Sequence, residues 1–304
     1  MTSFTGIIPP ICTPLDEDGR VDAVGLERLV GSLLSAGVHG IFTLGSTGEG
    51  IYLNDTDRKR VVDVVVGTVA GAVPVFAGAL DATTERVIDQ VKWVEEFRVD
   101  ALVVTAPFYA NVSPAEMVTH FEIVAAASSL PVLAYDIPSN VGYKLPHSVS
   151  IDLVSRRVVA GLKDSSGAFD EFNKILAAVG SMAGASLLTG SDKGALESLR
   201  AGAHGIVPGI GNICAGLFVT LWDAFAAGDD ATAEHAQAQI AAMTEIYGLG
   251  SAMGLGPHAS QLGGVKAVLV HDGVIGSARV SRPLSAYTTE AAVEAVSIAE
   301  AARG

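Results

Sequence analysis

The chain has 304 residues, of which 49% are hydrophobic, so it is long and apolar enough to bury a large core. Its 33 acidic and 19 basic residues give a formal net charge of -14. Phosphate binding needs clustered lysine and arginine, and no such run appears, so neither nucleic acid nor an anionic membrane is an expected partner. A small anionic substrate stays open, because a few local hydrogen-bond donors can outweigh the overall charge.

The cysteines, the N-terminus and one apolar stretch bear on the location of the protein. Cys12 and Cys214 form no CxxC pair, which argues against a disulfide framework or zinc site and suits a reducing compartment. The first six residues lack the basic and apolar segments of a signal peptide. The apolar stretch 61–80 is broken by an aspartate, two glycines and a proline, so it predicts a helix end, a turn and a strand. We therefore expect a cytoplasmic protein without a membrane span.

Apolar runs rich in β-branched residues alternate along the chain with segments whose apolar residues have helical spacing. The expected strands are residues 6–12, 38–44, 73–78, 101–105, 131–135, 158–163, 186–190 and 205–209. The expected helices between them are about 22–36, 55–71, 83–97, 114–127, 149–156, 168–179 and 192–201. From about Cys214 onward the pattern is helical throughout.

This alternation predicts an α/β fold, a (β/α)8 TIM barrel with a small C-terminal helical extension. A doubly wound open sheet is the alternative, but eight strand–helix units fit a closed barrel better. We place the catalytic barrel at residues 1–227 and the C-terminal helical region at residues 228–304.

The stretch 158–167 holds the most informative local pattern. Its apolar first half predicts a buried strand that ends in Lys163, and turn and capping residues follow. An ammonium is costly to bury in a parallel sheet covered on both faces. Burial lowers the pKa of a lysine, and a neutral amine is a nucleophile toward a ketone. Lys163 is therefore either a Schiff-base lysine or a strand-end lysine that reaches solvent.

Polar residues at the carboxyl ends of the other strands bear on this choice, because reactive groups of such barrels lie there. They are Thr13, Ser46, Thr47, Thr105, Tyr109, Tyr135, Thr189 and Asp192. No other lysine ends a strand, and Lys266, which also has apolar neighbours, lies in the C-terminal helical region. No pair of carboxylates is placed for glycoside hydrolysis.

The loop Gly45-Ser-Thr-Gly-Glu-Gly50 admits two interpretations. It lacks the spacing and the following lysine of a phosphate-binding loop. Its glycines allow positive φ and close backbone approach, so the hydroxyls of Ser46 and Thr47 could hold a carboxylate together with nearby N–H groups. The alternative is an ordinary turn with capping hydroxyls.

The tyrosines and histidines are ambiguous by themselves. Tyr135 and Tyr109 are either packing residues or proton donors and acceptors beside a reactive lysine. The seven histidines show no HxH or HExxH spacing, so no ligand set for a metal is visible.

Taken in order, Gly-Ser-Thr-Gly-Glu at 45–49, Tyr-Asp-Ile-Pro at 135–138 and Gly-Leu-Lys-Asp at 161–164 make the chain resemble a known family. This is the dihydrodipicolinate synthase / N-acetylneuraminate lyase family, and the resemblance extends to Pro-Phe-Tyr at 107–109 and Gly-Ser-Asp at 190–192. It implies a barrel with a C-terminal helical extension, assembled as a homotetramer that is a dimer of dimers. It also implies lysine Schiff-base chemistry on pyruvate or another 2-keto acid, without a metal or an organic cofactor.

The resemblance assigns roles to individual residues. Lys163 matches the Schiff-base nucleophile, and Tyr135 matches the acid–base residue beside it. Ser46 and Thr47 match the pair that binds the keto-acid carboxylate, one hydroxyl also relaying a proton. Tyr109 matches a loop tyrosine that enters a neighbouring subunit's site and joins this relay. The remaining assignments are Val207, whose backbone would line the pyruvate pocket, and Glu49, which would brace the loop.

One departure from the family pattern bears on the substrate. The synthases place an arginine soon after the Tyr-x-x-Pro motif for the carboxylate of aspartate semialdehyde, and Asn140 stands there in this chain. Loss of a bidentate donor should weaken that recognition, so Asn140 instead becomes a candidate for binding another substrate. We therefore expect a lyase-like aldolase that cleaves a hydroxylated 2-keto acid, such as a 2-keto-3-deoxy sugar acid, to pyruvate and an aldehyde.

Other functions stay open at this point. They are a 4-hydroxy-tetrahydrodipicolinate synthase, a 2-keto acid dehydratase or hydratase-aldolase, a metal-dependent aldolase, and a keto-acid sensor without catalysis. The set of Lys163, Tyr135, Tyr109, Ser46 and Thr47 argues against the sensor, because simple binding has no physical need for all of these groups.

Overall fold

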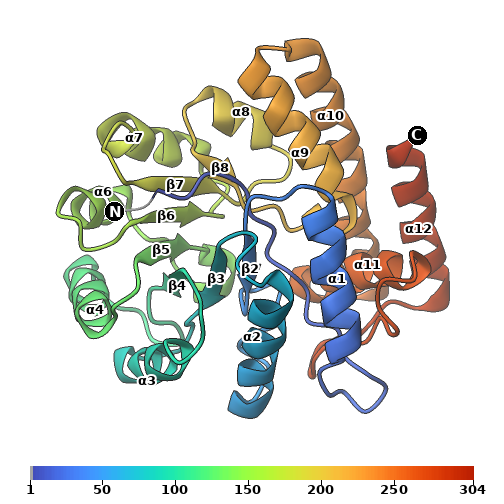
Figure 1. Cartoon of the computed structure of the whole chain (residues 1–304), viewed down its shortest axis with the longest axis horizontal. Coiled ribbons are helices and arrows are strands. Elements are labelled where there is room, and N and C mark those ends of the chain that lie inside the picture. Colours follow the sequence, from blue (N-terminus) through green and yellow to red (C-terminus); the bar gives the residue numbers. More distant parts are fainter. Residues whose placement is uncertain (1–2) are drawn as a thin grey trace.

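Eight short parallel strands form the centre of the computed structural model, which describes residues 3–304 (Figure 1). The strands are β1 (Gly6–Ile7), β2 (Ile41–Thr43), β3 (Val75–Gly78), β4 (Ala101–Thr105), β5 (Val132–Asp136), β6 (Gly161–Asp164), β7 (Ser186–Thr189) and β8 (Gly205–Ile206). They are hydrogen-bonded in the order β1-β8-β7-β6-β5-β4-β3-β2, all in parallel. The expected (β/α)8 TIM barrel is confirmed.

The segment after β1 completes the ring by reaching β2. Pro10 pairs with Phe42 in a parallel bridge, the Phe42 N–H donates to the Pro9 carbonyl, and the Ile11 N–H donates to the Phe42 carbonyl. Regular pairing ends at Ile7 because two successive prolines have no N–H to donate to a ladder. The first strand is therefore shorter than the run 6–12 that the sequence predicts, although the chain stays buried along it.

Helices follow the strands and cover the outside of the ring (Figure 1). They are α1 (Ala23–Ser35), α2 (Asp55–Val69), α3 (Thr84–Val94), α4 (Pro114–Ala127), α5 (Pro138–Val141), α6 (His147–Ser155), α7 (Phe169–Val179), α8 (Ala195–Arg200) and α9 (Gly211–Ala227). Several begin at the capping residues that the sequence offers. The clearest is α4, where Ser113 and Glu116 form a capping box before a proline at the first turn.

The C-terminal part of the chain is mostly helical, as expected, apart from residues 272–288, and it packs at one side of the ring (Figure 1). It consists of α10 (Asp230–Met243), the 3-10 helix η1 (Thr244–Met253), α11 (Pro257–His271) and α12 (Thr289–Arg303). The division into a barrel of residues 1–227 and a separate region of residues 228–304 stays a prediction. One element was not expected, namely α5, a single turn that directly follows β5.

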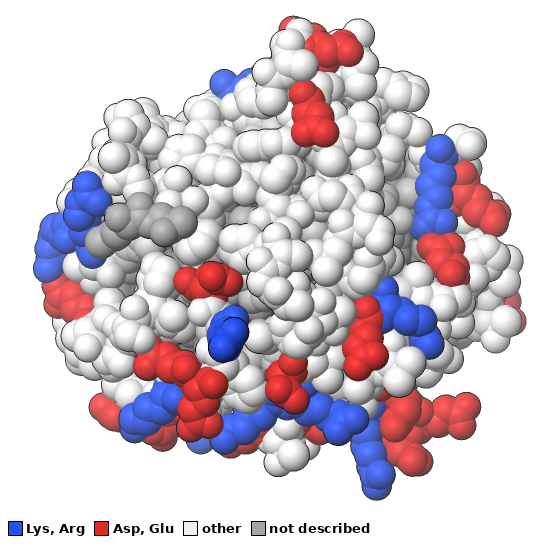
Figure 2. Space-filling model, viewed as in Figure 1, with Lys and Arg blue, Asp and Glu red and all other residues white. Residues whose placement is uncertain are grey.

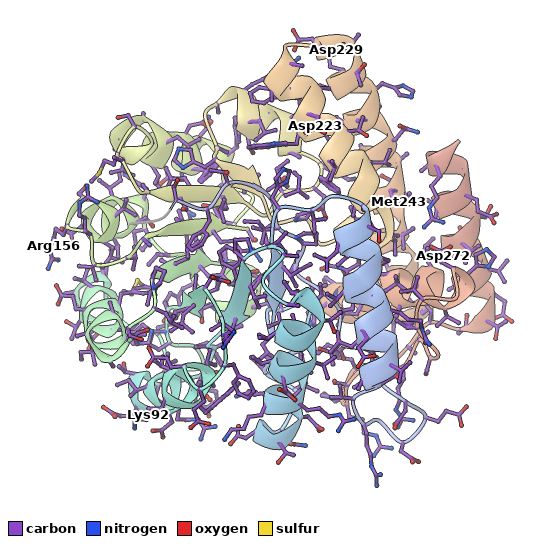
Figure 3. The ribbon with its side chains drawn as sticks, viewed as in Figure 1. Lys92, Arg156, Asp223, Asp229, Met243 and Asp272 are labelled. Carbon is purple, nitrogen blue, oxygen red and sulfur yellow. The ribbon has the colours of Figure 1, made fainter. Side chains whose placement is uncertain are left out.

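The apolar residues of strands and helices form one continuous buried core. Most charged side chains lie outside it, and the buried exceptions include Lys163, Lys266 and Glu49. Lys92 on α3 and Arg156 after α6, for example, lie on the outer side of the helix ring (Figure 3). On the face shown in Figure 2, acidic and basic side chains are mixed around the rim and the centre is mostly uncharged. Within residues 3–304, no helix is long and apolar enough to cross a membrane.

Candidate active site

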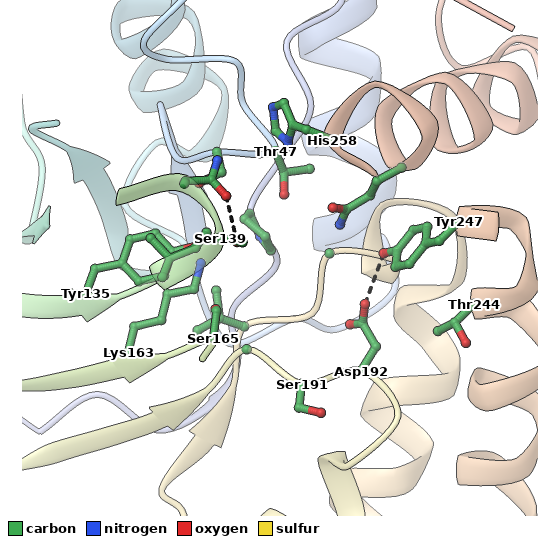
Figure 4. Close-up of a pocket in the computed structure, with 18 of the residues that line it drawn as sticks. Thr47, Tyr135, Ser139, Lys163, Ser165, Ser191, Asp192, Thr244, Tyr247 and His258 are labelled. Carbon is green, nitrogen blue, oxygen red and sulfur yellow. Dashed lines mark hydrogen bonds between the residues drawn. The ribbon is translucent and has the colours of Figure 1, made fainter. Parts of the chain in front are cut away.

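A cavity of about 370 Å³ opens at the carboxyl ends of the strands (Figure 4). Its walls come from the loops after β2, β5, β6, β7 and β8 and from η1 and α11. Most residues singled out in the sequence line it, namely Ser46, Thr47, Tyr135, Asn140, Lys163, Asp192 and Val207. Of the strand-end positions predicted from local patterns, Ser46, Thr47, Tyr135, Lys163 and Asp192 are thus brought together, whereas Thr13, Thr105, Tyr109 and Thr189 are not among the residues that line this cavity.

Lys163 and Tyr135 form the floor of this cavity. Their two strands pair Tyr135 directly with Lys163, and both side chains are buried, at 3% and 4% exposure. The Lys163 Nζ lies over the Tyr135 ring, 4.1 Å from its centroid, and 4.7 Å from the centroid of Phe42. Within residues 3–304, no carboxylate lies within ion-pair distance of this ammonium.

The loop 45–50 lies beside the lysine and brings Ser46 and Thr47 to the cavity wall. Of the two uses that its glycines allow, positive φ is not the one found here, because the positive angles belong to Leu44 and Glu49, both at 56°. The glycines serve close approach instead. A Cβ on Gly45 would lie 2.6 Å from the Phe42 ring, and one on Gly50 would lie 2.2 Å from the Leu44 carbonyl oxygen.

Glu49 ties this loop to the C-terminal region. It is fully buried and forms an ion pair with the Lys266 Nζ, which is fully buried on α11. Its second oxygen accepts a hydrogen bond from the Ser281 N–H, and the Lys266 Nζ also donates to the Arg279 carbonyl over 2.8 Å. Both charged groups are therefore compensated, and Glu49 braces the loop rather than facing the cavity.

Asn140 and Val207 both line the cavity. Asn140 is exposed on α5, and its side-chain oxygen accepts a hydrogen bond from the Ser139 hydroxyl over 2.9 Å. Val207 is buried after β8, where its N–H donates to the Thr189 carbonyl over 2.7 Å. Their roles in substrate binding stay predictions.

Tyr109 does not join the cavity of its own chain. It lies in the loop between β4 and α4 with 98% of its surface exposed and with φ at 79°. Its neighbour Phe108 packs against the core, so the loop is anchored while the tyrosine points away. Within one chain, Tyr109 and Lys163 are not brought together.

Most of one side of the cavity was not identified from the sequence, namely the far wall, which is formed by the β7–α8 loop, η1 and α11. It is lined by polar groups from β7–α8, η1 and α11, namely Ser191, Lys193, Thr244, Tyr247, His258 and Gln261. The Tyr247 hydroxyl donates to Asp192 Oδ2 over 3.0 Å (Figure 4). Burial raises the pKa of Asp192 to about 6, against the opposing effect of the Tyr247 hydroxyl, and its Oδ1 has no hydrogen-bond partner among the described residues. No local pattern identifies η1 or α11 as part of a site.

Two of the seven histidines, His258 and His120, differ in their surroundings. His258 lies in the cavity wall and stacks on Tyr52, with ring centroids 5.9 Å apart, and burial lowers its pKa. His120 is instead a buried packing residue. Its ring bonds the Thr84 hydroxyl and the Thr105 carbonyl, and burial lowers its pKa to about 4. Within residues 3–304, no three His, Cys, Asp or Glu side chains are grouped as metal ligands would be.

A TIM barrel with a buried lysine, a phenol and hydroxyl groups at the carboxyl ends of its strands defines a class of barrel enzymes. Comparison with known proteins narrows this class to one family. The model of the dihydrodipicolinate synthetase family matches residues 3–302. The chain belongs to this family, and it is an enzyme of the lyase and aldolase type.

Individual relatives carry different names. An uncharacterised DapA-like lyase of Halobacterium salinarum is 34% identical over 87% of this chain and 83% of its own length. A 4-hydroxy-tetrahydrodipicolinate synthase of Methanopyrus kandleri is 30% identical over 74% of this chain and 75% of its own. YagE of Escherichia coli, named as a candidate 2-dehydro-3-deoxy-D-gluconate aldolase, is 32% identical over 81% of this chain and 82% of its own. The crystal structure of YagE with pyruvate superimposes with a TM-score of 0.91, covering 99% of both chains at 28% identity.

Proposed function

We propose that the protein is a class I aldolase that cleaves a hydroxylated 2-keto acid, such as a 2-keto-3-deoxy sugar acid, to pyruvate and an aldehyde. The observation that carries this proposal is the buried Lys163 Nζ, which lies over Tyr135 on the cavity floor without an ion-pair partner among the described residues. A neutral amine in such a position can attack a ketone that enters the cavity.

In the proposed mechanism, each of these groups has a role in forming the Schiff base. The hydroxyls of Ser46 and Thr47 hold the substrate carboxylate beside the lysine. The Lys163 amine adds to the C2 carbonyl, so a carbon–nitrogen bond forms, the carbon–oxygen double bond becomes single, and a proton passes from the nitrogen to the oxygen to give a hydroxyl. Tyr135 donates a proton to that hydroxyl, which leaves as water and yields an iminium.

In the cleavage step, Tyr135 acts as a base instead of an acid. Tyr135, as phenolate, takes the proton of the C4 hydroxyl, the C3–C4 bond breaks, and the electron pair moves into the iminium. This step releases the aldehyde and leaves an enamine. Tyr135 then gives this proton to C3, which restores the iminium and the phenolate. Water adds to C2, its two protons pass to the Tyr135 phenolate and to the lysine nitrogen, and the carbon–nitrogen bond breaks to release pyruvate and the Lys163 amine.

The far wall supports a hydroxylated substrate. Asp192, Ser191, Thr244 and Gln261 offer acceptors and donors for hydroxyl groups, and a polar lining of this kind fixes the orientation of a bound ligand. Asn140, which stands where the synthases place an arginine, has no charge with which to bind a second carboxylate. The relatives named above include both a synthase and a candidate sugar-acid aldolase, so the synthase is the second candidate.

Borohydride reduction in the presence of pyruvate tests the mechanism. We expect a pyruvate-derived adduct on Lys163 by intact mass and peptide mapping, absent in Lys163→Ala and formed far more slowly in Tyr135→Phe, by about a hundredfold or more. Turnover should persist in a chelator, and loss of turnover there would favour a metal-dependent aldolase. If pyruvate binds without forming an adduct, the result would favour a keto-acid sensor without catalysis.

Parallel assays test the substrate. We expect turnover of a 2-keto-3-deoxy sugar acid and little or no ring product from pyruvate with aspartate semialdehyde. The reverse pattern would make the protein a synthase despite Asn140. Release of water from the sugar acid without aldehyde would make it a dehydratase.

A further inference from the structure

Two buried carboxylates lie directly behind Tyr135 and Lys163. The register that pairs Tyr135 with Lys163 also pairs Asp136 with Asp164, one residue further along β5 and β6. Side chains alternate between the two faces of a strand, so the aspartates point away from the cavity toward the helix layer. They are 2% and 5% exposed. Two such carboxylates need compensation by a cation.

Lys144 supplies that cation. Its Nζ donates to Asp136 Oδ2 and lies 3.8 Å from Asp164 Oδ2. Asp136 Oδ1 accepts a hydrogen bond from the Leu145 N–H over 3.0 Å, and Asp164 Oδ1 is bonded by Ser166. Asp164 Oδ2 has no hydrogen-bond partner among the described residues, so the charge of Lys144 is what offsets it. Burial raises the pKa of Asp136, and the bond from Lys144 opposes this effect.

The segment that carries Lys144 also shapes the cavity. It follows α5, which presents Asn140 to the cavity, and turns at Gly142 with φ at 94°. The next residue, Tyr143, donates its hydroxyl to the Pro107 carbonyl in the loop that holds Tyr109. Through these contacts, residues 143 and 144 join the ends of β4, β5 and β6.

We propose that Lys144 is a positioning residue of the site: it joins Asp136 to Asp164, so holding Tyr135 and Lys163 in register, and it offsets the negative charge behind the reactive amine. The catalytic part of this inference rests on the proposed aldolase function, whereas the electrostatic part concerns the lysine itself.

Charge is the part of this role that can be measured separately. The titratable or charged groups that line the cavity with Lys163 are Tyr135, Asp192, Lys193, Tyr247 and His258, and those behind it are Asp136, Asp164 and Lys144. In a Lys144→Met variant, the two carboxylates lose their cation and stabilise the Lys163 ammonium. The neutral amine then forms only at higher pH.

Competitive acetylation of the whole protein with acetic anhydride, read by peptide mass spectrometry over a series of pH values, reports the neutral fraction of Lys163 without any substrate. We expect the half-labelling pH of Lys163 in Lys144→Met to rise by about one pH unit. At a fixed neutral pH, borohydride trapping with pyruvate should slow about tenfold and recover as the pH is raised. Lys144→Arg keeps the charge and should label like the wild type.

Two further variants complete the design. Lys92→Met removes an exposed lysine on the outer side of α3 that pairs with Asp89, and it should leave the Lys163 curve unchanged (Figure 3). Asp136→Asn removes one carboxylate while Lys144 remains, and it should move the half-labelling pH downward. If Lys144→Met does not fold, Asp136→Asn still tests the electrostatic role of Lys144.

The outcomes separate the two proposals. A Lys163 labelling curve that is unchanged in a folded Lys144→Met, or in Asp136→Asn, overturns the role of Lys144. If borohydride trapping with pyruvate slows equally in Lys144→Met and Lys144→Arg, and its pH dependence does not change, the role of Lys144 is also overturned. That result would describe only a packing defect. Shifted labelling without any pyruvate adduct in the wild type would uphold Lys144 and refute the aldolase.

Discussion

The carboxyl group of Asp192 lies in the cavity wall in surroundings that disfavour its charge. It is 8% exposed, and burial raises its pKa from 3.8 to about 6 even though the Tyr247 hydroxyl and the Ile210 N–H donate to it. A group of this kind lowers stability when it is ionised, and such groups cluster at functional sites. Its retention in the cavity fits a role toward substrate rather than toward folding.

An Asp192→Asn variant should therefore be more stable than the wild type above pH 6. Because the folded pKa lies above the unfolded one, the folded state holds the proton more tightly, and stability falls as pH rises from 3.8 through 6. The full difference is up to about 3 kcal/mol. Urea unfolding above pH 6 and near pH 3.8 would measure it: the gain should be present at the higher pH and small at the lower one. An equal gain at both would assign it to packing instead of charge.

At the scale of elements, α11 connects the cavity to the loop 45–50. Its first turns place His258 and Gln261 in the cavity wall, and about two turns later Lys266 reaches Glu49. The loop that carries Ser46 and Thr47 is thus fixed from behind by a helix far away in sequence. This arrangement makes the C-terminal helices part of the site and not an appendage to the barrel.

Replacement of Lys266 by methionine should destabilise the protein by about 3–5 kcal/mol, because it leaves Glu49 buried without a counter-charge. The double variant Lys266→Met with Glu49→Gln should recover much of this loss, and Lys92→Met, at an exposed pair, should change little. Urea unfolding of five proteins forms the measurement: the wild type, the three variants above and the single variant Glu49→Gln. Independent, additive effects of the two substitutions would contradict the pairing.

Contacts between distant elements are the part of the site that could not be predicted from the sequence. Lys163 and Tyr135 were predictable because a polar residue at the end of an apolar run is a local pattern. The pair Glu49–Lys266 joins residues 217 apart in sequence, and Tyr247 reaches Asp192 over 55 residues, so no local pattern marks either contact. The single turn of α5 is likewise too short to show helical periodicity.

At the scale of the whole molecule, contacts within a single chain do not explain the position of Tyr109. A large aromatic side chain that is 98% exposed, on a backbone with φ at 79°, gains little from packing within its own subunit. We propose that the protein is a homotetramer, a dimer of dimers, in which Tyr109 completes the hydroxyl relay of a neighbouring subunit's site. Sedimentation velocity should then give a tetramer.

Subunit mixing would test this sharing of residues directly. Tyr109→Ala and Lys163→Ala should each be inactive or lose activity about a hundredfold or more as pure proteins. Mixed and reassembled, they should regain activity, because a Tyr109→Ala chain keeps its own Lys163 and receives Tyr109 from its Lys163→Ala neighbour. The matched control mixes Lys163→Ala with Tyr135→Phe, two defects that lie in the same chain's cavity and cannot complement each other. If the first mixture stays as inactive as the control, Tyr109 acts within its own chain or not at all, and each subunit's site would be complete by itself.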